Sequence, residues 1–452
     1  MTEISSPYYN LFDAALIDNS TESYEYIEYR ENNVTVKDLD SYQLSSSDLN
    51  TWLLPHQSYL HVKGKILKED GTAITANDIV TIENNGFNLF KNARYEIGDK
   101  EIESIQHVGV MTTILNLVEF SHDYSKTCAS NMFWHVDTSE HANMERFVYN
   151  GGEANLDSND KIINFAKSIK HNVDFNEGFL ERSKKTKESK QISVFLPLSR
   201  LFGFCKDINR VFRGITHTIK LDKNDDDNII HCVGNNKYKF ELSYLSWWIP
   251  KIRPLKIIAI LEKKISEENT INLMWEGARV YRSGIRTDRY GDWSVATIQH
   301  KPSHIYIVFQ KADKLRDQTQ TNMIFDHMNL TNIHVRVNST QYPATAFQTD
   351  FSGRNPDYTR VYHSLLEAGL KSQNIDSGCD VNYTDFSRLY PIFHFNLNHK
   401  ETRLYENSGA AEISVHFELK ETPADQYYVY CIIVSEKSME INFIDGKTQI
   451  IH

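Results

Sequence analysis

The 452 residues are enough for two large β domains, and 40% hydrophobic with 24% charged residues is the composition of an ordinary soluble globular protein. A net charge of −11 argues against a surface that wraps nucleic acid, because such a surface must be basic. Five widely spaced cysteines, no signal-peptide pattern and no apolar window of ~20 residues predict free thiols in a cytosolic or nuclear protein.

The first part of the chain, residues 1–49, is polar and irregular, and we interpret it as an N-terminal arm. Its residues 24–29 have three readings that the sequence leaves open: a strand, an arm ordered against a neighbouring subunit, or a surface strap on its own subunit. A strand is predicted at 59–67, where a turn signal follows. A helix is predicted at 108–120, because its apolar residues recur at helical spacing.

Residues 181–190 are highly charged and are expected to form an exposed loop. They hold the only dense basic cluster in the sequence: Arg182, Lys184, Lys185, Lys187 and Lys190. Such a cluster could be a nuclear import signal or a DNA contact. The reading we prefer is a solvated loop, because Glu181 and Glu188 dilute its charge.

A set of three strands occurs twice in the same order. An apolar strand is followed by a strictly alternating strand and then by a long aromatic one, with no helical period between them, which predicts antiparallel sandwiches. The first set lies at 192–198, 215–221 and 238–248, and the second at 389–397, 412–419 and 427–435. Pro250 and Pro254 mark a join between the two halves, so we place a domain boundary near residue 250. The pattern alone leaves open whether one module was duplicated.

The second half is expected to open with a strand at 255–261. Further strands are predicted at 293–298 and 304–309. A long insertion at 351–385 contains a helical spacing at 358–370.

Known catalytic and ligand-binding motifs do not occur in the sequence. There is no phosphate-binding loop, dinucleotide fingerprint, H-E-x-x-H or nucleophile elbow. Residues 222–226 faintly resemble a calcium loop, but Asp227 stands at the glycine position and Val233 at the position of the bidentate glutamate. His231 and Cys232 lack the paired spacing of a zinc site. We therefore predict no catalytic residue, no metal site and no cofactor.

Four segments, in order, resemble signatures of double jelly-roll major capsid proteins. The relatives are those of Polinton/Maverick elements and adintoviruses, including copies in animal genomes. The segments are residues 59–66 with Asp70-Gly71-Thr72, FLPLSRLFGF at 195–204 with Asp207, residues 324–344 from IFDH to YPA, and residues 389–391 with the strand at 432–435 and Lys437. The resemblance extends from about residue 54 to the C-terminus.

This resemblance implies an all-β fold of two tandem jelly rolls, with short helices in the insertions. The first roll would span 50–250 and the second 251–452, after the arm at 1–49. The implied function is a major capsid protein that forms pseudo-hexagonal trimers, the capsomers of an icosahedral shell around double-stranded DNA. The implied partners are neighbouring capsomers, a penton protein and packaged DNA that is bound without sequence specificity. Synthesis in the host cytoplasm, assembly in the host nucleus and residence in the virion would follow.

Two residue pairs have a functional and a structural reading. Trp247 and Trp248 could stack on a base or a sugar, but an aromatic pair at the end of a strand more often belongs to the core. Asp326 and His327 could be half of a catalytic dyad, but inside a capsid-like motif we interpret them as a turn that caps a strand.

Two other classes of protein remain as alternatives. A cellular carbohydrate-binding β sandwich would need exposed aromatic residues around a groove, or a calcium site. An enzyme on a cupin-type jelly roll would need clustered histidine and carboxylate ligands on neighbouring strands, and the sequence shows no such cluster.

Overall fold

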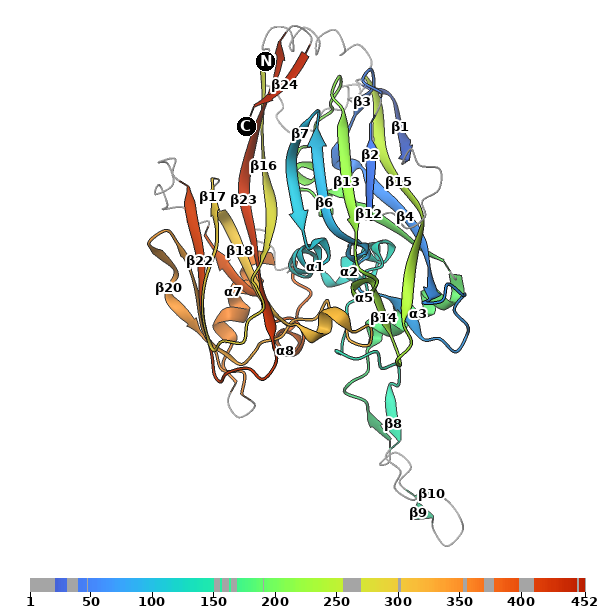
Figure 1. Ribbon diagram of the computed structural model, residues 1–452, viewed down its shortest axis with the longest axis vertical. Coiled ribbons are helices and arrows are strands. Elements are labelled where there is room, and N and C mark those ends of the chain that lie inside the picture. Colours follow the sequence, from blue (N-terminus) through green and yellow to red (C-terminus); the bar gives the residue numbers. More distant parts are fainter. Residues whose placement is uncertain are drawn as a thin grey trace, which may run out of the picture.

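The computed structural model describes residues 21–30, 40–46, 48–149, 155–156, 162–163, 169–189, 191–254, 270–299, 302–352, 356–369, 378–397, 410–444 and 447–451. The strand predicted at 255–261 lies outside these ranges. The described chain forms two β sandwiches that lie side by side, with the strands of both running roughly along the long axis of the molecule (Figure 1).

The first sandwich consists of two four-stranded main sheets. One sheet has the order β1 (Thr21–Arg30), β15 (Tyr238–Pro254), β4 (Tyr59–Lys68), β12 (Ile192–Pro197), and the other has the order β2 (Ser41–Ser45), β13 (His217–Lys223), β6 (Phe90–Ile97), β7 (Lys100–Gln106). The short β3 (Trp52–Leu53) also pairs with β15, and β5 (Val80–Ile82) pairs with β14 (Ile230–Cys232).

The second sandwich repeats this plan. One sheet has the order β16 (Thr270–Arg282), β23 (Tyr427–Ile444), β18 (Pro302–Lys311), β21 (Phe393–Asn396), and the other has the order β17 (Tyr290–Ile298), β22 (Ala411–Leu419), β19 (Leu330–Val337), β20 (Thr340–Gln348). The short β24 (Lys447–Ile451) extends the first of these sheets by pairing with β23.

The two sandwiches have the same strand order. When the main strands of each are numbered one to eight along the chain, one sheet reads 1-8-3-6 and the other reads 2-7-4-5 in both sandwiches. We use these strand numbers as names for the two kinds of sheet. An eight-stranded sandwich of two antiparallel sheets is a jelly roll. The two predicted sets of three strands are strands six, seven and eight of each roll, so the predicted repeat is confirmed.

The N-terminal segment supplies strands one and two of the first sandwich. β1 pairs with β15 along nearly its whole length, and β2 pairs with β13. Residues 24–29 therefore form part of a strand that pairs with β15 of the same chain. β15 continues through Pro254, so a division at residue 250 lies inside this strand.

Helices and small hairpins occupy the connections between strands. They are α1 (Val108–Glu119), α2 (His122–Lys126), α3 (Glu177–Ser189), α4 (Gly203–Asp207), α5 (Asp226–Ile229), α7 (Thr359–Gly369) and α8 (Tyr383–Arg388). The hairpin pairs β8 (Phe147–Tyr149) with β11 (Ile169–His171) and β9 (Asn155–Leu156) with β10 (Ile162–Ile163) project below the first sandwich (Figure 1). None of the helices in the described ranges has the length and apolar character to span a membrane.

The charged segment at 181–190 was predicted wrongly. Residues 177–189 form helix α3, which buries Phe179, Arg182, Ser183 and Thr186 on one face, three or four residues apart. The lysines of the cluster lie around the rest of the helix, and Lys190 lies outside the described residues. The helical spacing is hard to recognise because only one of the four buried residues is apolar.

The alternating strand β22 faces the core as its sequence predicts. Ile413, Val415, Phe417 and Leu419 are buried, while the residues between them are exposed or half-buried. All five cysteines are free, with Cys205, Cys232 and Cys431 buried.

The register of β22 can be tested with one core substitution and one control. Val415→Asp should unfold the second sandwich, because burying a valine is worth ~1.5–3 kcal/mol and a buried carboxylate costs several more. A domain has only ~5–15 kcal/mol of stability. Glu412→Ala, on the exposed face of the same strand, should melt like the wild type. Thermal melts of both variants make the comparison, and equal melting temperatures would contradict the register.

Candidate functional site: the junction between the two sandwiches

The two sandwiches meet where the 1-8-3-6 sheet of the second faces α1, β7 and α4 of the first (Figure 1). His107, at the start of α1, lies edge-on to Tyr430 of β23 at 5.4 Å between ring centroids. Phe204 of α4 contacts Trp275 of β16 in the same manner, also at 5.4 Å. Segments far apart in the sequence therefore build one continuous contact.

Gly203 is the closest point of this contact. A β-carbon at Gly203 would overlap the backbone of Glu276 on β16, so any other residue would push α4 away from the second sandwich. Asp207, at the end of α4, accepts a hydrogen bond from the Glu276 amide at 2.8 Å. The FGF and Asp207 part of the signature at 195–207 thus fixes the position of one sandwich on the other.

A buried carboxylate binds the N-terminal end of α4. Glu103 of β7 accepts hydrogen bonds from the amides of Gly203, at 3.1 Å, and Phe204, at 2.6 Å. Burial raises the pKa of Glu103, and the positive charge of Lys437 on β23 opposes this effect. Burial likewise lowers the pKa of Lys437, against the attraction of Glu103. The two side chains therefore favour each other's charged form across the junction.

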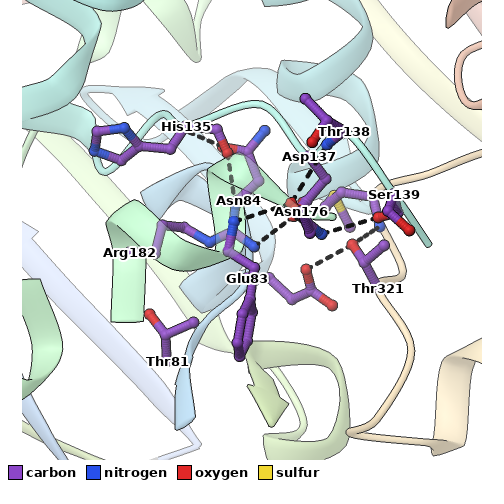
Figure 2. A network of polar contacts seen from close by, with 12 residues as sticks. Thr81, Glu83, Asn84, His135, Asp137, Thr138, Ser139, Asn176, Arg182 and Thr321 are labelled. Atoms are coloured by element: carbon purple, nitrogen blue, oxygen red, sulfur yellow. Dashed lines mark hydrogen bonds and ion pairs between the residues drawn. The ribbon is translucent and has the colours of Figure 1, made fainter. Parts of the chain in front are cut away.

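A second polar network lies around α3 and the end of β5 (Figure 2). Arg182 of α3 and Asp137 form an ion pair at 2.8 Å in which both side chains are fully buried. Arg182 also donates to the carbonyl oxygens of Ile82 and His135, and Asn176 donates to Asp137 at 2.8 Å. Because a buried charge is tolerated only with such partners, each group holds the next in place.

This network crosses from the first sandwich to the second at two points. Glu83, which follows β5, accepts hydrogen bonds from the Thr321 hydroxyl at 2.8 Å and from the Asn322 amide at 2.9 Å. The Tyr390 hydroxyl donates to the Asp137 carbonyl at 2.9 Å. Burial raises the pKa of Glu83, and the nearby charge of Asp137 acts in the same direction.

The residues singled out from the sequence have structural roles. Trp247 is fully buried in the core, as predicted, while Trp248 is half-buried on the outer face of β15. Asp326 pairs with Lys314 at 2.9 Å, whereas the His327 ring accepts from the Asn329 amide, so each side chain has a structural partner of its own.

The residues weighed as calcium or zinc ligands lie in ordinary secondary structure. Residues 222–226 span the end of β13 and the start of α5, with Asp225 immediately before that helix. His231 and Cys232 are buried in β14, where burial lowers the pKa of His231 to about 4. Within the described ranges no group of three potential ligands is close enough to hold a metal ion.

Sequence reasoning missed the junction residues. Glu83, Asp137 and Arg182 carry charge, and charge predicts exposure. Arg182 was singled out only as part of the basic cluster, and the other junction groups that were singled out lie inside the signature segments, namely Gly203, Phe204, Asp207, Tyr390 and Lys437. Glu103 could not be recognised as buried from the alternation of β7. Residues two apart on a strand share a face, and Glu101, which shares the face of Glu103, is exposed.

Comparisons with known proteins agree with this architecture. A family model described as a double jelly roll-like domain matches residues 153–439, more than half of the chain. A chain of the Sputnik virophage superposes with a TM-score of 0.64 at 10% identity, covering 100% of this chain and 93% of that one. No curated protein matches the sequence.

Two structures titled as major capsid proteins are also similar. The Faustovirus protein has a TM-score of 0.53 at 11% identity, covering 95% of this chain and 92% of its own. The mavirus protein has a TM-score of 0.51 at 11% identity, covering 98% and 92%. At identities this low, structural similarity shows the fold alone. The predicted all-β fold of two tandem jelly rolls is confirmed.

The buried ion pair can be tested on helix α3. Arg182→Met should destabilise the chain by ~3–5 kcal/mol, because Asp137 would remain buried without its partner. Lys184→Met, two residues further along on an exposed side chain, should change stability by less than ~0.5 kcal/mol. Chemical denaturation of both variants measures the difference. Equal midpoints would show that the buried pair does not stabilise the fold.

The close approach at Gly203 gives a second test. Gly203→Ala should cost ~1–3 kcal/mol through overpacking and should loosen the contact between the sandwiches. Gly284→Ala serves as the control, because a β-carbon there would meet no neighbouring atom within 4 Å. In calorimetry, Gly203→Ala should split or broaden the unfolding transition while Gly284→Ala keeps the wild-type profile. A wild-type profile for both would mean that α4 does not set the junction.

Proposed function

Because the chain belongs to the double jelly roll-like domain family, we propose that it is the major capsid protein of a double-stranded DNA virus of the Polinton/Maverick or adintovirus type, or an endogenous copy of one. The observation that carries this proposal is the pair of jelly rolls with one strand order, held together by a buried junction. Likeness over more than nine-tenths of the chain to the Faustovirus and mavirus major capsid proteins supports it.

The proposed activity is assembly and needs no catalytic residue, metal or cofactor. Three chains would contribute six similar sandwiches to a pseudo-hexagonal capsomer. Capsomers of this shape would tile an icosahedral shell. The roughly parallel course of the strands along the long axis of the molecule suits sandwiches that stand upright in such a shell (Figure 1).

The proposed partners follow from that role. Each trimer would contact neighbouring capsomers and, at the vertices, a penton protein. The shell would enclose double-stranded DNA without reading its sequence, in keeping with a net charge of −11. The protein would be made in the host cytoplasm, assembled in the host nucleus and retained in the virion.

The trimer can be tested with purified protein. Light scattering at micromolar concentration should give about three times the chain mass of 52.5 kDa. Electron microscopy of the same sample should show hexagonal blocks or shells. A monomer at every concentration tested would contradict the proposal.

A further inference from the structure

A cavity of about 610 Å³ lies between the two sandwiches of one chain. His107 and Tyr430, whose rings meet in the junction, both line it. Its other walls come from β6 and α5 of the first sandwich and from β16, β23 and η7 (Asp313–Arg316) of the second. Sites for small molecules have volumes of roughly 300–1,000 Å³, so the size suits such a ligand. We call this space the junction cavity.

Two arginines of the second sandwich line the junction cavity without a carboxylate partner. Arg282 is the last residue of β16, and Arg316 is the last residue of η7. Among the residues that the structure describes, neither guanidinium forms an ion pair. The Arg282 guanidinium lies over the ring of Tyr428, 4.6 Å from its centroid, and this contact restrains the side chain. Both arginines therefore keep donors for an anion, and the planar guanidinium suits phosphate in particular.

Three carboxylates also line the junction cavity, and each has a partner of its own. Asp225 pairs with Lys91 at 3.5 Å. Asp425 pairs with Lys311 at 3.2 Å. Asp313 accepts a hydrogen bond from the backbone amide of the next residue at 2.9 Å. These acidic groups are engaged elsewhere, so they leave the two arginines without a direct counter-ion.

The first turn of α1 brings backbone donors to the same space. Residues 108–110 line the junction cavity, and no side chain caps this end of the helix. Amides at a helix N-terminus favour anions, and their partial positive charge adds to that of the arginines. Burial lowers the pKa of His107 to about 4, and the charges of Arg282 and Lys91 act in the same direction. Positive groups of both sandwiches thus act on one place.

A buried polar atom at the wall of the junction cavity lacks a partner. Asn322 lines the cavity, and its side chain is 1% exposed. Its Nδ2 donates to the carbonyl of Asn228 at 2.8 Å, which fixes the amide, while its Oδ1 has no hydrogen-bond partner in the described part of the chain. Buried acceptors are normally satisfied, and this one calls for a donor such as a hydroxyl group.

We propose that the junction cavity binds a phosphorylated small molecule that also carries hydroxyl groups, as nucleotides and sugar phosphates do. Arg282, Arg316 and the first turn of α1 would hold the phosphates, and Asn322 would accept from a hydroxyl. The ligand would touch both sandwiches and would stabilise their junction. This inference goes beyond the proposed function and does not depend on assembly, because the cavity lies within one chain.

Calorimetric titration of the purified chain tests the site with ATP and with ribose phosphate. Arg282→Gln and Arg316→Gln should each raise the Kd at least about tenfold, the effect of losing one charge-assisted hydrogen bond. Arg336→Gln is the matched control, because this arginine is equally exposed but lies on β19, in the other sheet of the second sandwich. Thermal melts confirm that the variants fold, and ATP should raise the melting temperature of the wild type.

Two further probes separate the parts of the ligand. Adenosine, which has no phosphate, should bind far more weakly than ATP, and equal binding would overturn the assignment to an anion. Tripolyphosphate, which has no sugar hydroxyl, should bind more weakly than ATP, and equal binding would overturn the role of Asn322. No binding of ATP or ribose phosphate at millimolar concentration overturns the proposal. So does binding that Arg282→Gln and Arg316→Gln leave unchanged, because the ligand would then lie elsewhere.

Discussion

The Arg182–Asp137 pair is the constraint on which much of the junction depends. Two fully buried charges are stable only while their hydrogen-bond partners stay in place. Those partners include the carbonyl oxygens of His135 and of Ile82 in β5, and the Asp137 carbonyl in turn accepts from Tyr390 of the second sandwich. A rotation of one sandwich against the other would break the hydrogen bonds that Tyr390 donates to the Asp137 carbonyl and that Thr321 and Asn322 donate to Glu83. The junction is therefore geometrically specific, beyond what apolar packing alone would enforce.

Strands in which apolar and polar residues alternate were predictable from the sequence. β22 shows this best, because its polar and apolar residues alternate without interruption and only one register buries the apolar set. The repeated strand order indicated antiparallel sandwiches in both halves of the chain, and the family resemblance implied that these are two jelly rolls. These features depend on local pattern, which a sequence carries directly.

The part that depends on long-range pairing was not predictable. Arg182 lies in a segment whose charge predicts a solvated loop, and its burial is stabilised by partners distant in sequence, Asp137 and the carbonyl oxygens of Ile82 and His135. Glu83 finds its partners in residues 321 and 322 of the other sandwich. For residues 24–29 the sequence leaves a strand, an arm and a strap open, because it gives no sign that β15 extends far enough to pair with them. In each case the deciding partner is remote.

The presence of both sandwiches on one chain has a kinetic consequence. A six-block ring built from separate single sandwiches would require six molecules to meet, whereas this chain requires three. Tethered surfaces experience a local concentration of the order of millimolar, far above that of free protein in a cell. Half of the neighbour contacts in such a ring would thus form during folding, independent of dilution. Only the remaining half would respond to the amount of protein made, so that in the proposed shell expression level would control the onset of growth more sharply.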